Sequence, residues 1–323
     1  MLAACVVGGL LLPTLPAPTA ADPALSITWS PLAPALVKRT EAGSAVVNGF
    51  MYLFGGYITG FVPQPRVDAY DIATNTWHRL PDMPDGLTHM GVATDGVYVF
   101  IAGGYLPKSP SGQIFASDHV WRFDPAADSW TAMPPLPSPR GAGALVLVGR
   151  TLHYFGGSTI HRKDSASHWT FELDTDTAWH KAAPLPNPRN HIGGAQLGGL
   201  VYAVGGQHGQ DAAAVAQDEV DAFNPATKKW TTVAPMPTAR SHVNASTLTF
   251  QGLLVVAGGD PTPNAPTNEV DAYDPGAGTW TTLASLPQKN YAGVAVDLGP
   301  VMMSTTGATP KKTALSYEAT PSS

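Results

Sequence analysis

Cysteine and charged residues are both scarce in this sequence. Its 323 residues include a single cysteine, Cys5, and only 13% of them are Asp, Glu, Lys or Arg. One cysteine cannot close a disulfide within the chain, so packing alone must hold the fold, which suits a large domain. The formal net charge is −6 and no basic run occurs. Nucleic acid is therefore not an expected partner.

Long hydrophobic runs are also missing. The segment 1–21 carries no charge, but Pro13 and Pro16 interrupt its apolar part. What remains is too short to cross a bilayer, so the sequence predicts no integral membrane span.

The apolar N-terminal stretch resembles the hydrophobic region of a secretory signal, although the usual basic start is absent. Small residues precede Asp22 and would suit a cleavage site there. We therefore expect residues 1–21 to be an export segment and residues 22–323 to be secreted or periplasmic. One alternative is a lipid anchor through Cys5, because Leu2-Ala3-Ala4-Cys5 resembles a lipobox. The other is an apolar N-terminus with no export role.

Glycine, by contrast, is abundant and regularly spaced. Gly-Gly pairs recur at 55–56, 103–104, 156–157, 205–206 and 258–259, each after an apolar run such as MYLF or LHYF. Tryptophan recurs at 29, 77, 130, 179, 230 and 280, and segments such as VDAYD (67–71) and VDAFN (220–224) lie between the two signals. The period is 48 to 53 residues. Such self-similarity indicates a repeat architecture built from one unit per period.

This combination of signals resembles the kelch repeat, in which each unit is one four-stranded blade of a β-propeller. The resemblance covers roughly residues 26–319. A lone blade cannot bury both of its faces, so neighbouring blades must cover one another around a ring. The predicted fold is therefore all-β, with residues 22–323 as one domain.

Five repeats are complete and the sixth is split between the two ends of the chain. Residues 294–307 predict its first two strands, and residues 313–319 predict the third, with Tyr317 as its aromatic residue. SITW (26–29) would supply the fourth, with Trp29 in the place of the other tryptophans. We expect six blades, the last closed by an N-terminal strand.

The glycine pairs are expected to be scaffold. They occupy the same place in all five complete repeats, and the sequence has no G-x-G-x-x-G and no complete phosphate-binding P-loop motif. Nucleotide binding is therefore not predicted.

In kelch propellers the innermost strands line the central channel, and ligands usually bind where the segments leading into these strands meet the loops after the double glycines. Alignment on the double glycines gives two rows of side chains at this mouth. The first row is Arg39, Asp85 or its neighbours, Arg140, Arg189, Arg240 and Lys289. The second row, two residues on, is Glu41, His89, Gly141, His191, His242 and Tyr291.

The first row allows two interpretations. A recessed ring of arginines would suit a carboxylate, sulfate or phosphate through fork-like hydrogen bonds. Alternatively, an arginine at this place is common in kelch repeats and would only bond to neighbouring loops.

The second row also allows two interpretations. His89, His191 and His242 could converge on the axis and hold a divalent transition metal, with Glu41 adding an oxygen ligand. Alternatively, each histidine bonds to backbone and water at the channel lip.

The loops after the double glycines are long and differ in sequence, as expected where specificity lies. Gln207, His208 and Asp260 directly follow the glycines and are further candidate ligand contacts. Two hypotheses follow. The chain is a monomeric binding propeller for an acidic saccharide or a protein segment, or it is an enzyme. As an enzyme it would be a mutarotase or epimerase, loosely like the kelch sialic-acid mutarotase class, or a metal-assisted lyase.

Overall fold

The computed structural model describes residues 25–107, 115–308 and 314–322. The expected export segment 1–21, the cleavage site before Asp22 and the lipid anchor at Cys5 lie outside the described residues. None of the helices in these ranges has the length and hydrophobicity of a membrane-spanning segment.

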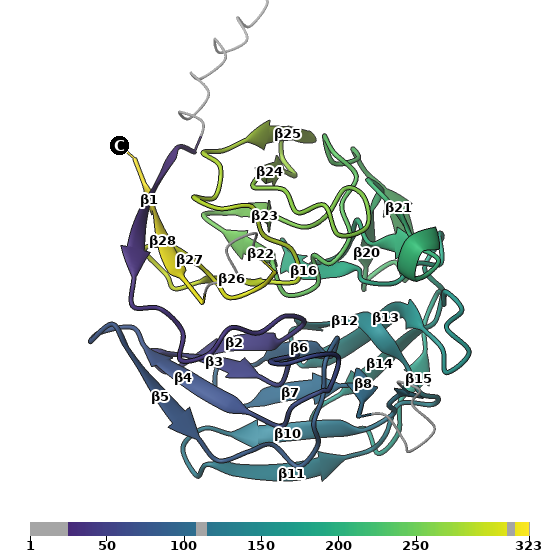
Figure 1. The fold of residues 1–323 in the computed structure, drawn as a ribbon. Coiled ribbons are helices and arrows are strands. Elements are labelled where there is room, and N and C mark those ends of the chain that lie inside the picture. The colour runs from purple at the N-terminus through teal and green to yellow at the C-terminus, as the bar shows by residue number, and fades with distance from the viewer. Residues whose placement is uncertain (1–24, 108–114, 309–313, 323) are drawn as a thin grey trace, which may run out of the picture.

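The described residues form six four-stranded antiparallel sheets arranged around a common centre (Figure 1). The innermost strands are β2 (Gly43–Val47), β6 (Gly91–Thr94), β12 (Gly141–Val148), β16 (Gly193–Leu197), β22 (Thr247–Phe250) and β26 (Val294–Asp297). The second strands are β3 (Phe50–Phe54), β7 (Val99–Ala102), β13 (Thr151–Ser158), β17 (Leu200–Val204), β23 (Leu253–Ala257) and β27 (Met302–Thr305). This is the predicted six-bladed propeller.

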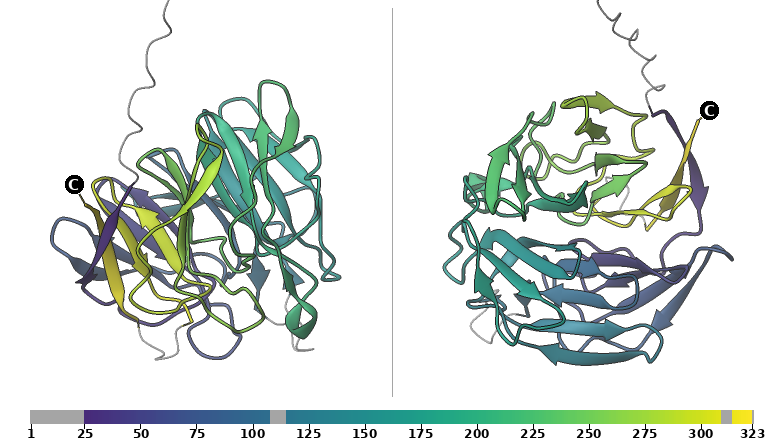
Figure 2. Two further views of the ribbon diagram at one scale, coloured as in Figure 1. Left: turned by 90° about the horizontal axis from the view of Figure 1, so that it is seen from above. Right: turned by 180° about the vertical axis from the view of Figure 1, so that it is seen from behind.

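The outer strands complete the blades. The third strands are β4 (Val67–Asp71), β10 (Val120–Asp124), β14 (His168–Glu172), β20 (Val220–Asn224), β24 (Val270–Asp274) and β28 (Ser316–Pro321). The fourth strands are β5 (Thr76–Leu80), β11 (Ser129–Met133), β15 (His180–Lys181), β21 (Lys229–Thr232), β25 (Thr279–Thr282) and β1 (Ile27–Leu32). Two loops form small hairpins, β8 (Tyr105–Leu106) with β9 (Phe115–Ala116) and β18 (Gln207–His208) with β19 (Val215–Ala216). The short helix η1 (Asp211–Ala213) lies in the second of these loops, on one face of the ring (Figure 2).

The last blade is closed by the N-terminal strand, as predicted. Strand β1 pairs antiparallel with β28, and the two lie side by side in Figure 1, purple beside yellow. Trp29 faces Ala319 in this pair, where Trp280 faces Tyr273 in the fifth blade. Tyr317 is therefore not at the repeat-aromatic position expected from the sequence, because it lies two residues before Ala319.

The hydrophobic core lies between the blades. The middle strands are buried on both faces, as in β17 with four of its five residues buried. One cluster packs Val255 of the fifth blade with Met302 of the sixth, and another packs Tyr52 with Ile101 of the first two blades. Each blade is stable only because its neighbours cover it.

The double glycines join neighbouring blades. The N–H of Gly56 donates to the carbonyl of Leu87 in the next blade at 2.9 Å, and Gly307 donates to Arg39 at 2.7 Å, which links the last blade to the first. The other four pairs make the equivalent bond through Gly104, Gly157, Gly206 and Gly259.

Glycine is required at these positions by conformation and by space. Gly206 has φ of 96°, a region that L-residues rarely adopt, and a Cβ there would lie 2.6 Å from the carbonyl oxygen of Asn190. The glycine pairs are therefore scaffold, as the sequence indicated.

Candidate functional site

Each blade places one left-handed residue at the start of its innermost strand. These residues form a ring around the axis, here called the axial ring: Glu41, His89, Ala142, His191, His242 and Ala292, all with φ between 50° and 56°. Main-chain hydrogen bonds connect them across blades, for example from Glu41 N–H to the carbonyl of Ala292 at 2.9 Å and from His89 N–H to that of Glu41 at 3.1 Å. Left-handed conformations in non-glycine residues cost free energy and cluster at functional sites.

The axial ring corrects the second sequence row in two blades. Gly141 and Tyr291 were expected in the row, but Ala142 and Ala292 occupy it. Gly141 and Tyr291 are one residue earlier, where the backbone instead pairs with the loop after the double glycine, opposite Ser158 and Ala308. Tyr291 nevertheless packs its ring on His242, with the centroids 5.5 Å apart.

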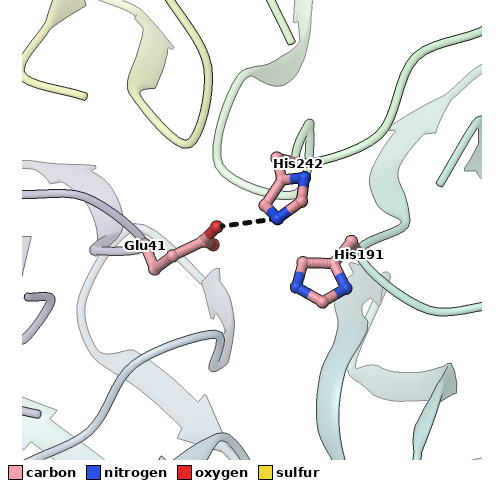
Figure 3. A group of neighbouring side chains, drawn as sticks. All are labelled: Glu41, His191 and His242. Carbon is pink, nitrogen blue, oxygen red and sulfur yellow. Dashed lines mark ion pairs between the residues drawn. The ribbon is translucent and has the colours of Figure 1, made fainter. Parts of the chain in front are cut away.

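The one carboxylate and the three imidazoles of the axial ring converge, and Figure 3 shows three of these side chains, Glu41, His191 and His242. Nε2 of His89 lies 3.4 Å from Oε1 of Glu41, and Nε2 of His242 lies 3.6 Å from the same oxygen. The ring of His191 lies between the other two imidazoles, 4.8 Å from His89 and 4.2 Å from His242 by centroids. We call Glu41, His89, His191 and His242 the axial cluster. Glu41, His191 and His242 each offer a ligand atom within 4.8 Å of the others, so they could hold a metal ion.

Polar neighbours fix the second nitrogen of every histidine in the axial cluster. Nδ1 of His89 bonds Thr88 Oγ1 at 2.9 Å, and Nδ1 of His191 bonds Oδ1 of Asn190. Nδ1 of His242 bonds Oδ1 of Asp260 at 2.8 Å. Thr88 and Asn190 were not among the site residues predicted from the sequence, although a polar residue directly precedes each of the three histidines.

Burial and mutual charge set the protonation of the axial cluster. Burial would raise the pKa of Glu41, but His89 and His242 hold it below the ordinary value. Burial would lower the pKa of His242, yet Glu41 and Asp260 raise it. Burial together with the two neighbouring imidazoles holds the pKa of His191 well below its ordinary value, so His191 is neutral. The cluster therefore contains one carboxylate, a readily charged imidazole and a neutral imidazole, which suits metal ligation or proton transfer.

The residues after the double glycines surround the axial cluster. Tyr105 packs on His89 at 4.8 Å, and Tyr57 packs on it at 5.7 Å. Gln207 is buried, and its Oε1 has no hydrogen-bond partner among the described residues. His208 instead turns outward, more than a third exposed, and pairs with Asp164 at 3.5 Å. Of the three candidates after the glycines, Asp260 contacts the axial cluster and Gln207 is buried with its backbone paired to Asn190, whereas His208 faces solvent.

The first sequence row is not a rim of free cations. Arg39, Arg189 and Arg240 are fully buried, and each forms an ion pair with an aspartate on the third strand of its own blade, namely Asp68, Asp221 and Asp271. Their guanidiniums also donate to main-chain carbonyls of that blade, as Arg189 does to Gly205 at 2.8 Å. This geometry matches the alternative in which the arginines bond to neighbouring loops.

The remaining members of the first row also differ from expectation. Arg140 has no aspartate and bonds Ser165 at 3.1 Å and Ser167 at 2.9 Å, while it stacks on Trp169. In the second blade Leu87 occupies the position of these arginines, and in the sixth it is Asn290. Lys289, expected in this row, precedes Asn290 and is exposed.

A central cavity of about 240 Å³ lies among the innermost strands, as predicted for a propeller channel. Residues that closely follow the axial ring line this cavity, such as Gly43, Met90 and Gly143, and the lining reaches Asp297 at the end of β26. None of the six residues of the axial ring is among those that line it.

Comparisons with known proteins agree with this architecture. The sequence matches the family described as "KLHDC2/KLHL20/DRC7 Kelch-repeats domain" over residues 88–295 and the "Kelch motif" over residues 38–84. Kelch repeat-containing protein At3g27220 of Arabidopsis thaliana is 27% identical, over 73% of this chain and 59% of its own length. Kelch-like protein terF of Aspergillus terreus is 29% identical, over 71% of this chain and 51% of its own length.

The chain thus spans between half and three-fifths of the length of these curated relatives. Among solved structures, the one titled "Structure of YjhT" superposes with a TM-score of 0.75, covering 90% of this chain and 99% of that one at 15% identity. At that identity the likeness shows the fold alone. Because the matched kelch-repeat region covers more than half of the sequence and the blades are those of a propeller, the chain belongs to the kelch-repeat family of β-propellers.

Proposed function

We propose that this propeller binds a segment of a partner protein on the face formed by the loops after the double glycines. One observation carries the proposal. Seven large hydrophobic side chains are exposed among the described residues, and five of them lie in these loops: Phe61, Val62, Ile160, Val215 and Leu315. Scattered exposed apolar residues are ordinary, whereas a concentration on one face indicates an interaction surface.

Contacts with neighbouring residues hold the loops that carry these exposed side chains in place. Phe61, 74% exposed, packs edge-on against buried Tyr57, which in turn contacts His89 of the axial cluster. Arg162 in the third loop pairs with Asp211 in the fourth at 2.9 Å, which connects the loops that carry Ile160 and Val215. An aromatic anchor held by its neighbours, with apolar side chains around it, is typical of protein-binding hot spots.

An acidic saccharide fits less well than a protein segment. Its recognition was expected from arginines at the mouth, but Arg39, Arg189 and Arg240 are buried in ion pairs. Releasing one of them toward a ligand would leave a buried aspartate uncompensated, which is costly.

Selection from a random-peptide display library tests the proposal. The bait is the purified chain, and the variants are Phe61→Asp and Val215→Asp. Val97→Asp is the matched control, because Val97 is 56% exposed in the hairpin between β6 and β7, away from these loops. We expect peptides with aromatic or aliphatic anchors that bind the wild type and the control at least tenfold more tightly than the two loop variants. Equal binding by all four proteins would overturn the proposal, and binding only to acidic glycans on an array would favour the saccharide.

We further propose that the chain is exported, since segment 1–21 has the composition of a secretory signal. Mass spectrometry of the exported protein should then find an N-terminus at Asp22. A lipid-modified Cys5 would support the anchored alternative, and retention in the cytoplasm with Met1 intact would refute export.

An enzyme acting on an acidic sugar is the second candidate. It is favoured by the carboxylate–imidazole–carboxylate arrangement of Asp260, His242 and Glu41, in which burial and charge perturb every pKa. Anomer exchange of a sialic acid, followed by nuclear magnetic resonance, tests it. Acceleration by the wild type that is lost in Glu41→Gln would support a mutarotase, and an unchanged rate would exclude that activity.

A further inference from the structure

We propose that the axial cluster is a binding site for one divalent transition metal ion of the zinc type. The ligands would be Glu41, His191 and His242, with His89 as the fourth. This inference does not rest on the proposed protein-binding function, because it concerns the floor of the loop-rich face and not the exposed loop tips.

The distances between the candidate ligand atoms are close to those of a tetrahedral zinc site. Zinc–nitrogen and zinc–oxygen bonds of about 2.0–2.1 Å in a tetrahedron place neighbouring ligand atoms about 3.4 Å apart. Oε1 of Glu41 is already 3.4 Å from Nε2 of His89 and 3.6 Å from Nε2 of His242. The ligand atoms of Glu41, His191 and His242 lie within 4.8 Å of one another, so a side-chain shift of about 1 Å would complete the tetrahedron.

The outer contacts of the histidines have the pattern of a metal site. Metal-binding histidines usually give their second ring nitrogen to a carboxylate, carbonyl or other polar group, which fixes the tautomer and aims the free nitrogen at the metal. Nδ1 of His242 is hydrogen-bonded to Oδ1 of Asp260 at 2.8 Å, and Nδ1 of His191 is hydrogen-bonded to Oδ1 of Asn190. Because Oδ1 of Asn190 can only accept, Nδ1 of His191 carries the proton and Nε2 presents its lone pair.

The side chain of Glu41 supplies an independent indication of a cation site. Its side chain is 5% exposed, and Oε2 has no hydrogen-bond partner among the described residues. A buried carboxylate oxygen without a partner is costly, and a bound cation would satisfy it. His242, 20% exposed, is the most accessible member of the cluster and marks the side from which an ion would enter.

The backbone directs these side chains inward. All four residues have a left-handed backbone with φ between 50° and 55°, and Ala142 and Ala292 hold the other two positions of the axial ring. The ring thus gathers four ligands around the axis and places small residues at its other two positions. Three imidazoles and one carboxylate suit zinc, cobalt, nickel or copper better than calcium or magnesium, which prefer all-oxygen sites.

Metal titration tests the inference directly. The protein, stripped with a chelator, would be titrated with Zn²⁺ by calorimetry and with Co²⁺ by visible absorption, and the bound metal counted by mass spectrometry. We expect about one ion per chain, a tetrahedral Co²⁺ spectrum, and a higher Tm with metal than without. Glu41→Gln and His191→Ala should each abolish stoichiometric binding. Asp260→Asn should weaken binding about 10–100-fold while leaving the stoichiometry at one ion per chain, as expected of a positioning residue.

His208→Ala is the matched control, because His208 is an exposed histidine outside the axial cluster. It should bind Zn²⁺ as the wild type does. Glu41→Gln keeps the size of the side chain, so it remains informative if His191→Ala does not fold. The inference is wrong if the wild type binds no stoichiometric metal, or if a folded Glu41→Gln variant binds Zn²⁺ with unchanged affinity.

Discussion

Arg240 and Asp271 form an ion pair inside the fifth blade, with Nη2 and Oδ2 2.5 Å apart and both side chains excluded from solvent. Arg39 with Asp68 repeats the pair in the first blade. In the second blade Leu87 and Trp121 replace both partners, whereas in the third blade Arg140 remains and bonds Ser165 and Ser167 in place of an aspartate. The aspartate therefore does not occur without the arginine, as expected of a carboxylate that is tolerated in a protein interior only when it is paired.

Removal of one partner of this buried pair should destabilise the protein strongly. We expect Asp271→Ala to lower the free energy of unfolding by about 3–5 kcal/mol, because it leaves the guanidinium of Arg240 uncompensated. The control is Asp174→Ala, which breaks a surface pair with Arg150 at 2.8 Å where both side chains are about half exposed. That change should cost far less, because solvent screens the pair and its side chains are already mobile at the surface. Urea unfolding measures both, and equal losses would show that burial of the pair is unimportant.

The glycine that joins two blades should be far less replaceable than a glycine in the open turn between β16 and β17. Gly206→Ala adds a Cβ 2.6 Å from a carbonyl oxygen of the same blade, on top of a left-handed backbone that costs about 1–2 kcal/mol. Gly199→Ala, with φ of 78° and no atom within 4 Å of the added Cβ, has only the second cost. Thermal unfolding should give a clearly lower Tm for Gly206→Ala. A smaller loss than for Gly199→Ala would contradict the crowding at the double glycine.

Acid should weaken the third blade first. Nδ1 of His153 lies 3.0 Å from Nε2 of His168 in the core, and burial lowers the pKa of His153 to about 3 and that of His168 to about 4 from 6.5. Below about pH 6.5 these two histidines bind protons in the unfolded chain but not in the folded chain. Stability is therefore complete above about pH 6.5 and falls as the pH drops toward 4, by up to about 1.4 kcal/mol per pH unit for each histidine.

A double variant that copies the second blade separates this effect from other titrations. Phe100 and Val120 occupy there the places of His153 and His168, so His153→Phe with His168→Val should fold. Its free energy of unfolding, measured in urea between about pH 7 and pH 4.5, should fall less steeply than that of the wild type. Part of the slope remains because the pKa of His191 is also lowered. Parallel curves for the two proteins would place the acid sensitivity elsewhere.

The fold could be predicted from the sequence because the same local sequence signals recur from repeat to repeat. Double glycines, tryptophans and apolar runs fixed the period, and the missing fourth strand of the last repeat pointed to Trp29 at the other end of the chain. Each signal has a local physical cause, namely a left-handed turn, a blade-to-blade contact and a buried strand.

The candidate site was predicted less well, because its geometry depends on exact register. The spacing from Glu41 to Gly55 equals that from His191 to Gly205, but His242 lies farther from its double glycine at Gly258. The common spacing also joins Ala142 to Gly156 and Ala292 to Thr306, so the sequence did carry a signal for the ring positions of the third and sixth blades.

The burial of the arginines depends on contacts distant in sequence. Asp68 lies far along the chain from Arg39 and pairs with it only once β4 lies beside β3. A signal was nonetheless present, because the aspartate of the VDAYD and VDAFN segments occurs only in repeats that also have the arginine. The convergence of His89, His191 and His242 could be expected because all three occupy one repeat position, whereas the partners of their second nitrogens could not.

The tryptophans allow the contact between blades to be measured one hydrogen bond at a time. Nε1 of Trp280 donates to the carbonyl of Ala234 in the preceding blade at 2.9 Å, and four other repeat tryptophans make the same bond. Trp130 occupies the same strand position in the second blade, but its buried Nε1 has no partner among the described residues. Replacement by phenylalanine removes similar apolar area at both sites, so the difference between the two variants reports the hydrogen bond.

We expect Trp280→Phe to lower the free energy of unfolding by about 0.5–1.5 kcal/mol more than Trp130→Phe does, because it leaves the partly buried carbonyl of Ala234 without its donor. Trp130→Phe removes an unsatisfied N–H and so offsets part of its own packing loss. Guanidinium unfolding of the two variants measures the difference. Equal losses would mean that apolar contact alone holds the blades together and that the repeated tryptophan is selected for its surface and not for its N–H.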